Sequence, residues 1–184
     1  MRAASALMPT PNPGFIVFAG VRTRHARVRA PRFPPMGFRT IVVMADNSDL
    51  RWQQPLNFPI ADFLGITFTS QSNGNAVAEF HARAQHANPM GTLHGGILCD
   101  LADAAMGVAF ATTLGPGESF TTLELKINFL RPVWTGLLKA EGNVVSRGRT
   151  VGLVTCGITD EKNRLIASAT STCMILAGEA AKNR

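Results

Sequence analysis

Two glycines and one carboxylate are the residues of this chain whose types and spacing point most directly to chemistry. Gly95 and Gly96 follow His94 and lead directly into an apolar stretch over residues 97–114. A helix start has backbone N–H groups without intrahelical partners and a positive dipole end, and glycines let a ligand oxygen approach that backbone closely. Residues 88–96 therefore predict a helix start that can stabilise a developing negative charge.

The carboxylate of Asp103 lies inside the predicted helix, where the pattern calls for an apolar residue. With 3.6 residues per turn, one face is uniformly apolar and carries Ile97, Leu98, Leu101, Ala104, Ala105 and Val108. The opposite face carries Gly96, Cys99, Asp103, Met106, Gly107 and Phe110. We therefore expect a helix buried on both sides and a carboxyl whose desolvation raises its pKa unless a donor reaches it. The alternative is a structural carboxylate, or one that reaches an exposed edge.

The spacing of Gly95 and Asp103 predicts that one chain does not complete the site. Eight residues of helix separate them, which corresponds to about 12 Å along the axis. An N–H that stabilises an oxyanion and a carboxylate that activates water must both lie about 3 Å from neighbouring reacting atoms. We therefore expect an isologous dimer in which the helix start of one subunit faces Asp103 of the other.

A known family shares this combination of residues. The chain has Asn-x-x-Gly-x-x-His-Gly-Gly over residues 88–96, the helical Asp103, and Ile-Asn-Phe-Leu-Arg-Pro over residues 127–132. Over residues 55–176 it resembles the hotdog-fold acyl-CoA thioesterases of the PaaI-like branch. The resemblance implies an α+β hotdog fold with one long central helix wrapped by a curved antiparallel sheet of five to six strands. It also implies homodimers that pair their sheets, in many members as dimers of dimers (homotetramers).

The resemblance also implies roles for individual residues. Asp103 would act as general base or nucleophile on the thioester, and Gly95 would supply the oxyanion N–H. Asn88 would lie beside the thioester or the attacking water, and Thr122 would place a hydroxyl near that water. The implied reaction is hydrolysis of an acyl-CoA to a free acid and CoA, with CoA as part of the substrate and no cofactor. The preferred acyl group stays open.

Other chemistries remain as alternatives. His94 would be the base if the chain were a hotdog enoyl-thioester hydratase or dehydratase, although its place before the glycines favours ordering of the helix start. A non-catalytic acyl-CoA-binding protein is the third possibility. A nucleophile elbow of the type Gly-x-Ser-x-Gly is missing from the sequence, and His81, His86 and Cys99 lack the spacing of a metal site.

Strand patterns flank the helix on both sides. Residues 66–70 and 75–81 predict a hairpin around Ser72-Asn-Gly74. Alternating residues from 123 to 129 predict a half-buried strand that ends at Pro132, and residues 137–146, 151–159 and 164–176 predict an antiparallel meander. One helix and these strands fit the hotdog inventory, although other α+β arrangements fit the pattern too.

Basic residues near the strand ends are candidates for the CoA phosphates. Arg131 follows one predicted strand, and Arg147, Gly148 and Arg149 form a turn whose backbone N–H groups could also contribute. A solvated arginine is the alternative at each position.

Composition divides the 184-residue chain into two parts. Residues 1–45 hold seven of the 18 basic residues and none of the 12 acidic ones, so the net charge of +6 resides in this extension. We expect it to be a disordered tail, an arginine-rich targeting peptide or sequence upstream of the true start at Met36 or Met44, followed by a thioesterase domain over 46–184. The nearly neutral domain speaks against nucleic acid as a partner, and no apolar run reaches membrane-spanning length. Three cysteines without paired spacing fit a reducing, cytoplasmic compartment.

Overall fold

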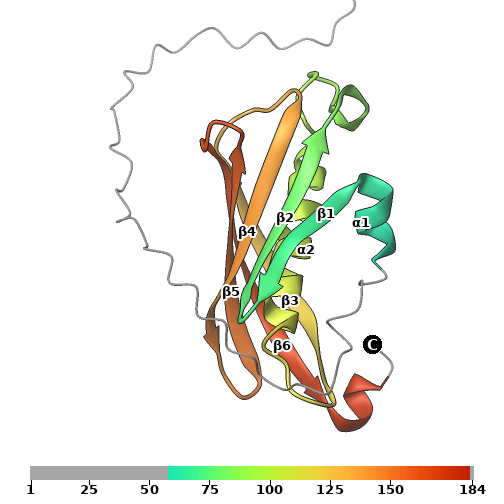
Figure 1. Cartoon of the computed structure of the whole chain (residues 1–184), viewed down its shortest axis with the longest axis vertical. Coiled ribbons are helices and arrows are strands. Elements are labelled where there is room, and N and C mark those ends of the chain that lie inside the picture. Colours follow the sequence, from blue (N-terminus) through green and yellow to red (C-terminus); the bar gives the residue numbers. More distant parts are fainter. Residues whose placement is uncertain (1–57, 183–184) are drawn as a thin grey trace, which may run out of the picture. The chain divides into compact units, whose positions relative to one another are not determined.

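The computed structural model describes residues 58–182, in which one long helix packs against a curved antiparallel sheet (Figure 1). The predicted extension over residues 1–45 lies outside this range. The elements follow one another as α1 (Pro59–Leu64), β1 (Ile66–Ser72), β2 (Asn75–Ala82), the 3-10 turn η2 (Ala84–His86), α2 (Gly95–Ala111), β3 (Glu118–Phe129), β4 (Gly136–Arg147), β5 (Val151–Asp160), β6 (Leu165–Ala177) and the 3-10 turn η3 (Gly178–Ala181).

The sheet has six strands in the order β1-β2-β4-β5-β6-β3, and every neighbouring pair is antiparallel. The predicted hairpin is confirmed, and so is the meander of the three strands predicted over 137–146, 151–159 and 164–176, with ends shifted by one or two residues. The strand predicted over 123–129 begins earlier, at Glu118, and does not continue the meander, because it pairs with β6 and not with β4. Asn73 and Gly74 have φ values of 49° and 78°, which is the left-handed pair that a tight two-residue hairpin requires. The strand β3, which follows the helix, pairs with β6 and forms one edge of the sheet.

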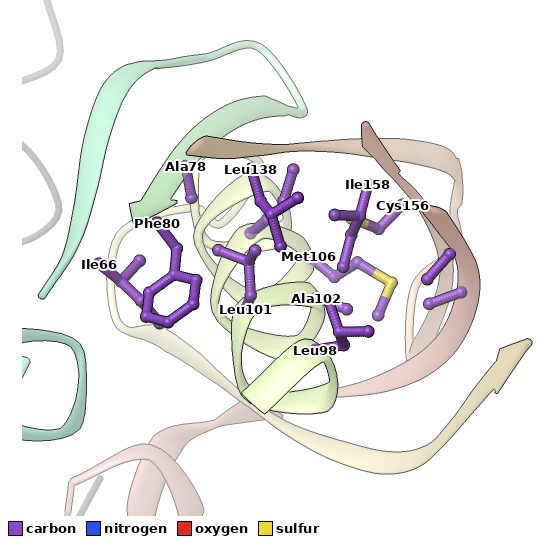
Figure 2. Close-up of a cluster of buried hydrophobic side chains, with 14 of the residues drawn as sticks. Ile66, Ala78, Phe80, Leu98, Leu101, Ala102, Met106, Leu138, Cys156 and Ile158 are labelled. Atoms are coloured by element: carbon purple, nitrogen blue, oxygen red, sulfur yellow. The ribbon is translucent and has the colours of Figure 1, made fainter. Parts of the chain in front are cut away.

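The core lies between α2 and the concave face of the sheet. Figure 2 shows Leu98, Leu101 and Met106 of the helix pointing towards strand residues such as Phe80 and Ile158. All five of these side chains are buried. Apolar burial of this kind stabilises a domain by about 25 cal/mol per Å² removed from water.

Glycines allow two of the strands to approach the helix closely. A Cβ on Gly142 of β4 would lie 2.4 Å from the carbonyl oxygen of Ala105, and a Cβ on Gly152 of β5 would lie 2.3 Å from the Phe110 ring. Because real Cβ atoms do not come this close, only glycine fits at either position without movement of helix or strand. These contacts fix the height of α2 above the sheet.

The expected burial of α2 on both sides is confirmed in part. The stripe from Leu98 to Val108 is buried, as are Met106 and Phe110 on the opposite face. Asp103 is accessible to solvent in the single chain. The short helix α1 was not predicted, because six residues are too few to establish a helical period.

Candidate active site

The helix start has the geometry of an anion site. His94 is the N-cap of α2, and its Nδ1 accepts a hydrogen bond of 2.9 Å from the Gly96 N–H. Gly95 is the first helical residue, and its N–H has no acceptor within residues 58–182. A polarised N–H at the positive end of the helix dipole is therefore available to a ligand oxygen.

Asn88 closes the loop that leads to this helix start. Its Oδ1 accepts hydrogen bonds from the N–H groups of Met90 (2.9 Å) and Thr92 (3.3 Å), and its Nδ2 donates to the Thr92 hydroxyl (2.9 Å). Asparagine favours such turns because its short side chain imitates a backbone carbonyl. One amide hydrogen of Nδ2 is left for a ligand.

A groove of about 330 Å³ connects these groups. Its lining residues come from the loop, the helix start and the segment after β3, and they are Asn88, Thr92, Leu93, Gly95, Leu98, Phe129, Leu130, Arg131, Pro132 and Val133. The Phe129 ring packs against Gly95, since a Cβ there would lie 3.0 Å from Cζ. The groove thus combines an apolar wall with two polar donors, which is the usual character of a small-molecule site.

Asp103 lies two turns further along α2, beside β3. The Thr122 hydroxyl donates a hydrogen bond of 3.4 Å to its Oδ1. Although the side chain is open to solvent on one side, the surrounding protein desolvates the carboxylate and raises its pKa above the ordinary value. The Thr122 hydrogen bond works against this shift, and the negative charge of Asp100 adds to it.

The structure brings these residues together in two groups. Gly95, Asn88 and Arg131 line the groove, whereas Asp103 and Thr122 form a separate pair. Gly95 and Asp103 belong to one uninterrupted helix, so the predicted axial separation of about 12 Å holds within the chain.

The strand beside Asp103 offers an open edge. No described strand pairs with the outer edge of residues 122–129. The side chains of Leu123 and Phe129 are 53% and 54% exposed, and Leu130 just beyond is 49% exposed. An unpaired strand edge that also exposes large apolar side chains is a template for pairing with another strand.

The four predicted phosphate-binding residues are divided between the two ends of α2. Arg131 lines the groove at the helix start, and its Nη1 makes one long hydrogen bond (3.4 Å) to the Leu165 carbonyl. Arg147 lies near the other end and pairs with Glu118 at 2.5 Å. Within residues 58–182, Arg149 has no hydrogen bond or ion pair, and the Gly148 N–H bonds to the Val151 carbonyl.

A second groove was missed by the sequence analysis. It has a volume of about 400 Å³ and shares Arg131, Pro132 and Val133 with the first groove. Trp134 from the β3–β4 connection and Lys162 from the β5–β6 turn lie in its wall. Turns far apart in the sequence form this groove, and an exposed tryptophan next to Arg-Pro is the only signal that the sequence offers for it.

The described part of the chain offers neither a membrane-spanning helix nor a cluster of metal-binding side chains. None of the helices between residues 58 and 182 combines the length and apolarity needed to cross a membrane. In the same part of the chain, no group of three or more His, Cys, Asp or Glu side chains is placed to hold a metal ion.

Comparison with known proteins identifies the family. The model of the thioesterase superfamily matches residues 90–167. A Saccharolobus solfataricus protein assigned as a candidate esterase is 35% identical over 117 residues, which is 64% of this chain and 83% of that protein. The 1,4-dihydroxy-2-naphthoyl-CoA hydrolase of Listeria monocytogenes is 28% identical, over 63% of this chain and 94% of the hydrolase.

Solved structures give the same result. The Escherichia coli PaaI protein from the phenylacetic acid degradation operon superposes with a TM-score of 0.63 and 29% identity, over 66% of this chain and 87% of PaaI. A phenylacetic acid degradation-related protein from Ralstonia eutropha has a TM-score of 0.62 and 30% identity, over 68% of this chain and 96% of that protein. The chain therefore belongs to the thioesterase superfamily, a family of thioester hydrolases, and it has the hotdog fold.

Proposed function

We propose that this protein hydrolyses acyl-CoA thioesters to a carboxylic acid and free CoA, at a site that two copies of the chain build together. The observation that carries this proposal is the division of one helix into two half-sites. A free N–H at Gly95 opens into a groove, and a desolvated carboxylate at Asp103 lies about 12 Å further along beside an open strand edge. CoA as the thiol is supported by the Listeria hydrolase and by acyl-coenzyme A thioesterase 13 of Pongo abelii, which is 27% identical over 58% of this chain and 77% of that enzyme.

The strand edge supplies a simple way to join the half-sites. The Phe129 ring packs on Gly95, and Thr122 contacts Asp103. If two copies of β3 pair antiparallel so that Phe129 of one lies opposite Thr122 of the other, both helices lie on the same face of the joined sheet. Gly95 of each subunit is then level with Asp103 of its partner, and two-fold symmetry produces the site twice.

The reaction follows from the chemistry of these groups. In the general-base form, a water proton passes to the Asp103 carboxylate while the water oxygen bonds to the thioester carbon. The carbonyl oxygen gains negative charge, which the Gly95 N–H of the partner stabilises. The C–S bond then breaks, and the thiolate leaves and takes up the proton. In the alternative form, the carboxylate itself attacks and water hydrolyses the resulting anhydride. Neither form requires a cofactor or a metal.

Asn88 and Thr122 have supporting roles in this scheme. Asn88 lines the groove, and the Nδ2 hydrogen that Thr92 does not use would hold the thioester oxygen or the water. Thr122 holds one oxygen of Asp103 and so fixes the direction of the other.

Arg131 is the best placed of the four predicted phosphate-binding residues to meet a CoA phosphate, because it lines the groove. In the paired-strand arrangement, the Glu118 end of one β3 points towards residues 130–133 of the partner. The Arg147-Gly148-Arg149 turn would therefore reach the groove from the other subunit.

The hydratase alternative is disfavoured by the contact of His94. Its Nδ1 already accepts from Gly96, which leaves Nε2 as the N–H of a neutral ring. A base needs a free lone pair, so His94 would have to give up the helix cap to act. The binding-protein alternative differs in outcome, because it predicts affinity without turnover.

A thiol-release assay over short, medium and aryl CoA esters tests the proposal. We expect hydrolysis by the full chain and a loss of kcat/KM of about 10²- to 10⁴-fold for Asp103→Asn, the usual contribution of a positioned general base. Asp100→Asn is the matched control at a pH above the acid limb of Asp103, since this exposed carboxylate lies one turn earlier and acts on Asp103 only through its charge. Inertness on every ester would refute the enzyme proposal, and full activity of Asp103→Asn would refute the role of the carboxylate.

A further inference from the structure

The groove beside Trp134 has no role in the half-sites described above. It begins at Arg131, where the catalytic groove ends, and runs between the β3–β4 connection and the β5–β6 turn. The two grooves share three lining residues, Arg131, Pro132 and Val133, and so lie next to each other. A long ligand that reacts at Gly95 can therefore extend along these residues into the second groove.

Trp134 gives this groove an aromatic surface. Its side chain is 58% exposed, although tryptophan is costly to leave in water. An exposed indole in the wall of a groove offers a flat face on which a heteroaromatic base can stack.

The charged residues of the groove favour an anion. The two acids are already engaged, because Asp160 pairs with Arg164 at 2.6 Å and Glu161 accepts a hydrogen bond from the Leu137 N–H. No hydrogen bond or ion pair holds the ammonium of Lys162 within the described chain, and Arg131 makes only its one long bond to a carbonyl. Arg131 and Lys162 therefore line the same groove as the indole, each without an ion pair to any residue from 58 to 182. Against them stands one carboxylate, Glu161, which has no cationic partner in that range, so the lining keeps a net positive charge that suits phosphate groups.

We propose that this second groove binds the nucleotide end of the CoA thioester, with the adenine stacked on Trp134, the 3′-phosphate beside Lys162 and the pyrophosphate beside Arg131. This inference rests on the proposed function for its ligand. The pantetheine arm then runs through the region of Arg131 to Val133, and the thioester reaches Gly95. Binding of the nucleotide fixes the substrate but makes no contact with the reacting atoms.

Tryptophan fluorescence and calorimetry test the assignment on the full-length chain. Trp52 is the only other tryptophan, so the Trp52→Phe variant reports on Trp134 alone. We expect CoA to quench this signal. We also expect Trp134→Ala to weaken the Kd of CoA about 5- to 150-fold, which is the range for loss of one base-stacking contact. Trp134→Phe should restore most of the affinity, and Lys162→Arg should bind better than Lys162→Ala.

A truncated substrate separates this site from the catalytic one. Trp134→Ala and Lys162→Ala should raise KM for acyl-CoA and leave kcat/KM unchanged for the matching acyl-pantetheine thioester, which lacks the nucleotide. Unchanged CoA affinity in both variants, with hydrolysis intact, would overturn this inference and leave the proposed function standing. If CoA still quenches the Trp134 fluorescence of a chain that hydrolyses no ester, the proposed function is wrong and the assignment of this groove to the nucleotide stands.

Discussion

At the scale of single residues, the N–H of Gly95 can be removed by one substitution that leaves the other side chains of the proposed site unchanged. It is the first helical residue, where proline is well tolerated, and His94 before it is extended (φ −64°, ψ 132°), as a residue preceding proline must be. Gly95→Pro therefore deletes the N–H and keeps the helix. We expect kcat to fall about 10²- to 10³-fold, the usual effect of losing one oxyanion donor.

Gly95→Ala is the control for this substitution. It keeps the N–H and places the same Cβ 3.0 Å from the Phe129 ring, so any steric effect of the new atom appears in both variants. Steady-state kinetics of the two variants isolate the donor. Equal rates for the proline and alanine variants would show that the Gly95 N–H has no part in the reaction.

Asp103 predicts a pH dependence whose direction is fixed by its neighbours. In the proposed reaction the carboxylate is the active form of Asp103. Because desolvation raises its pKa, kcat/KM should begin to fall on acidification at a higher pH than it would with an ordinary aspartate. Thr122→Val removes a hydrogen bond that favours the charged form, which raises the pKa further and moves the acid limb to higher pH. Asp100→Asn removes a negative charge and should move the limb to lower pH.

A pH–rate profile of both variants measures these shifts. Thr122→Ser retains the hydroxyl and should restore the position of the acid limb. If Thr122→Val lowers the rate uniformly at every pH, the hydroxyl acts on the water or on the fold and leaves the Asp103 titration unaffected.

At the scale of elements, the packing of α2 on β4 depends on the missing side chain of Gly142. Gly142→Ala would place Cβ 2.4 Å from the Ala105 carbonyl oxygen, and neither the helix backbone nor the strand can yield easily. We expect the free energy of unfolding to fall by about 1–3 kcal/mol, as for overpacked cores, or by more. Urea denaturation at a fixed protein concentration measures the change.

Gly157→Ala on the neighbouring strand is the matched control. Its Cβ would meet only the end of the Leu165 side chain, at an ordinary 3.6 Å. The two substitutions add the same methyl group to the same sheet, so their difference reports the helix contact. Equal stabilities for both variants would contradict the close approach of α2 to β4.

At the scale of the whole molecule, a shared site predicts that two inactive variants repair each other. A heterodimer of Asp103→Asn and Gly95→Pro has one site in which both groups are wild type and one site in which both are altered. Random mixing makes half of the dimers heterodimers, so about a quarter of the wild-type activity should return. The measurement is the thiol-release rate after the two variants have exchanged subunits.

Each variant measured alone at the same total concentration is the control for this experiment. Dilution of the wild-type chain below its dimer dissociation constant should also abolish the rate per subunit. Failure to recover activity in heterodimers whose formation has been verified would place Gly95 and Asp103 in independent sites.

Local patterns predicted a large part of the fold. The helical period located α2, Asn73-Gly74 located the first hairpin, and period-two alternation located the remaining strands. These features depend on neighbours within a few residues, so the sequence states them directly. The short helix α1 was not predicted, because its six residues are too few to show a helical period. The sequence left open whether Asp103 is buried or reaches an exposed edge, because a helical wheel shows which residues share a face but not what covers that face.

The sequence by itself determined which residues are the candidates for the reacting groups and the distance between them. Gly95 and Asp103 lie eight residues apart on one rigid helix, so their separation follows from the helical rise alone. Only the tertiary structure decided what surrounds them. It put β3 at the sheet edge beside Asp103, joined Asn88, Gly95 and Arg131 in one groove, and brought Trp134 near Lys162. These contacts link segments far apart in the chain, and chain folding, not local spacing, brings such segments together.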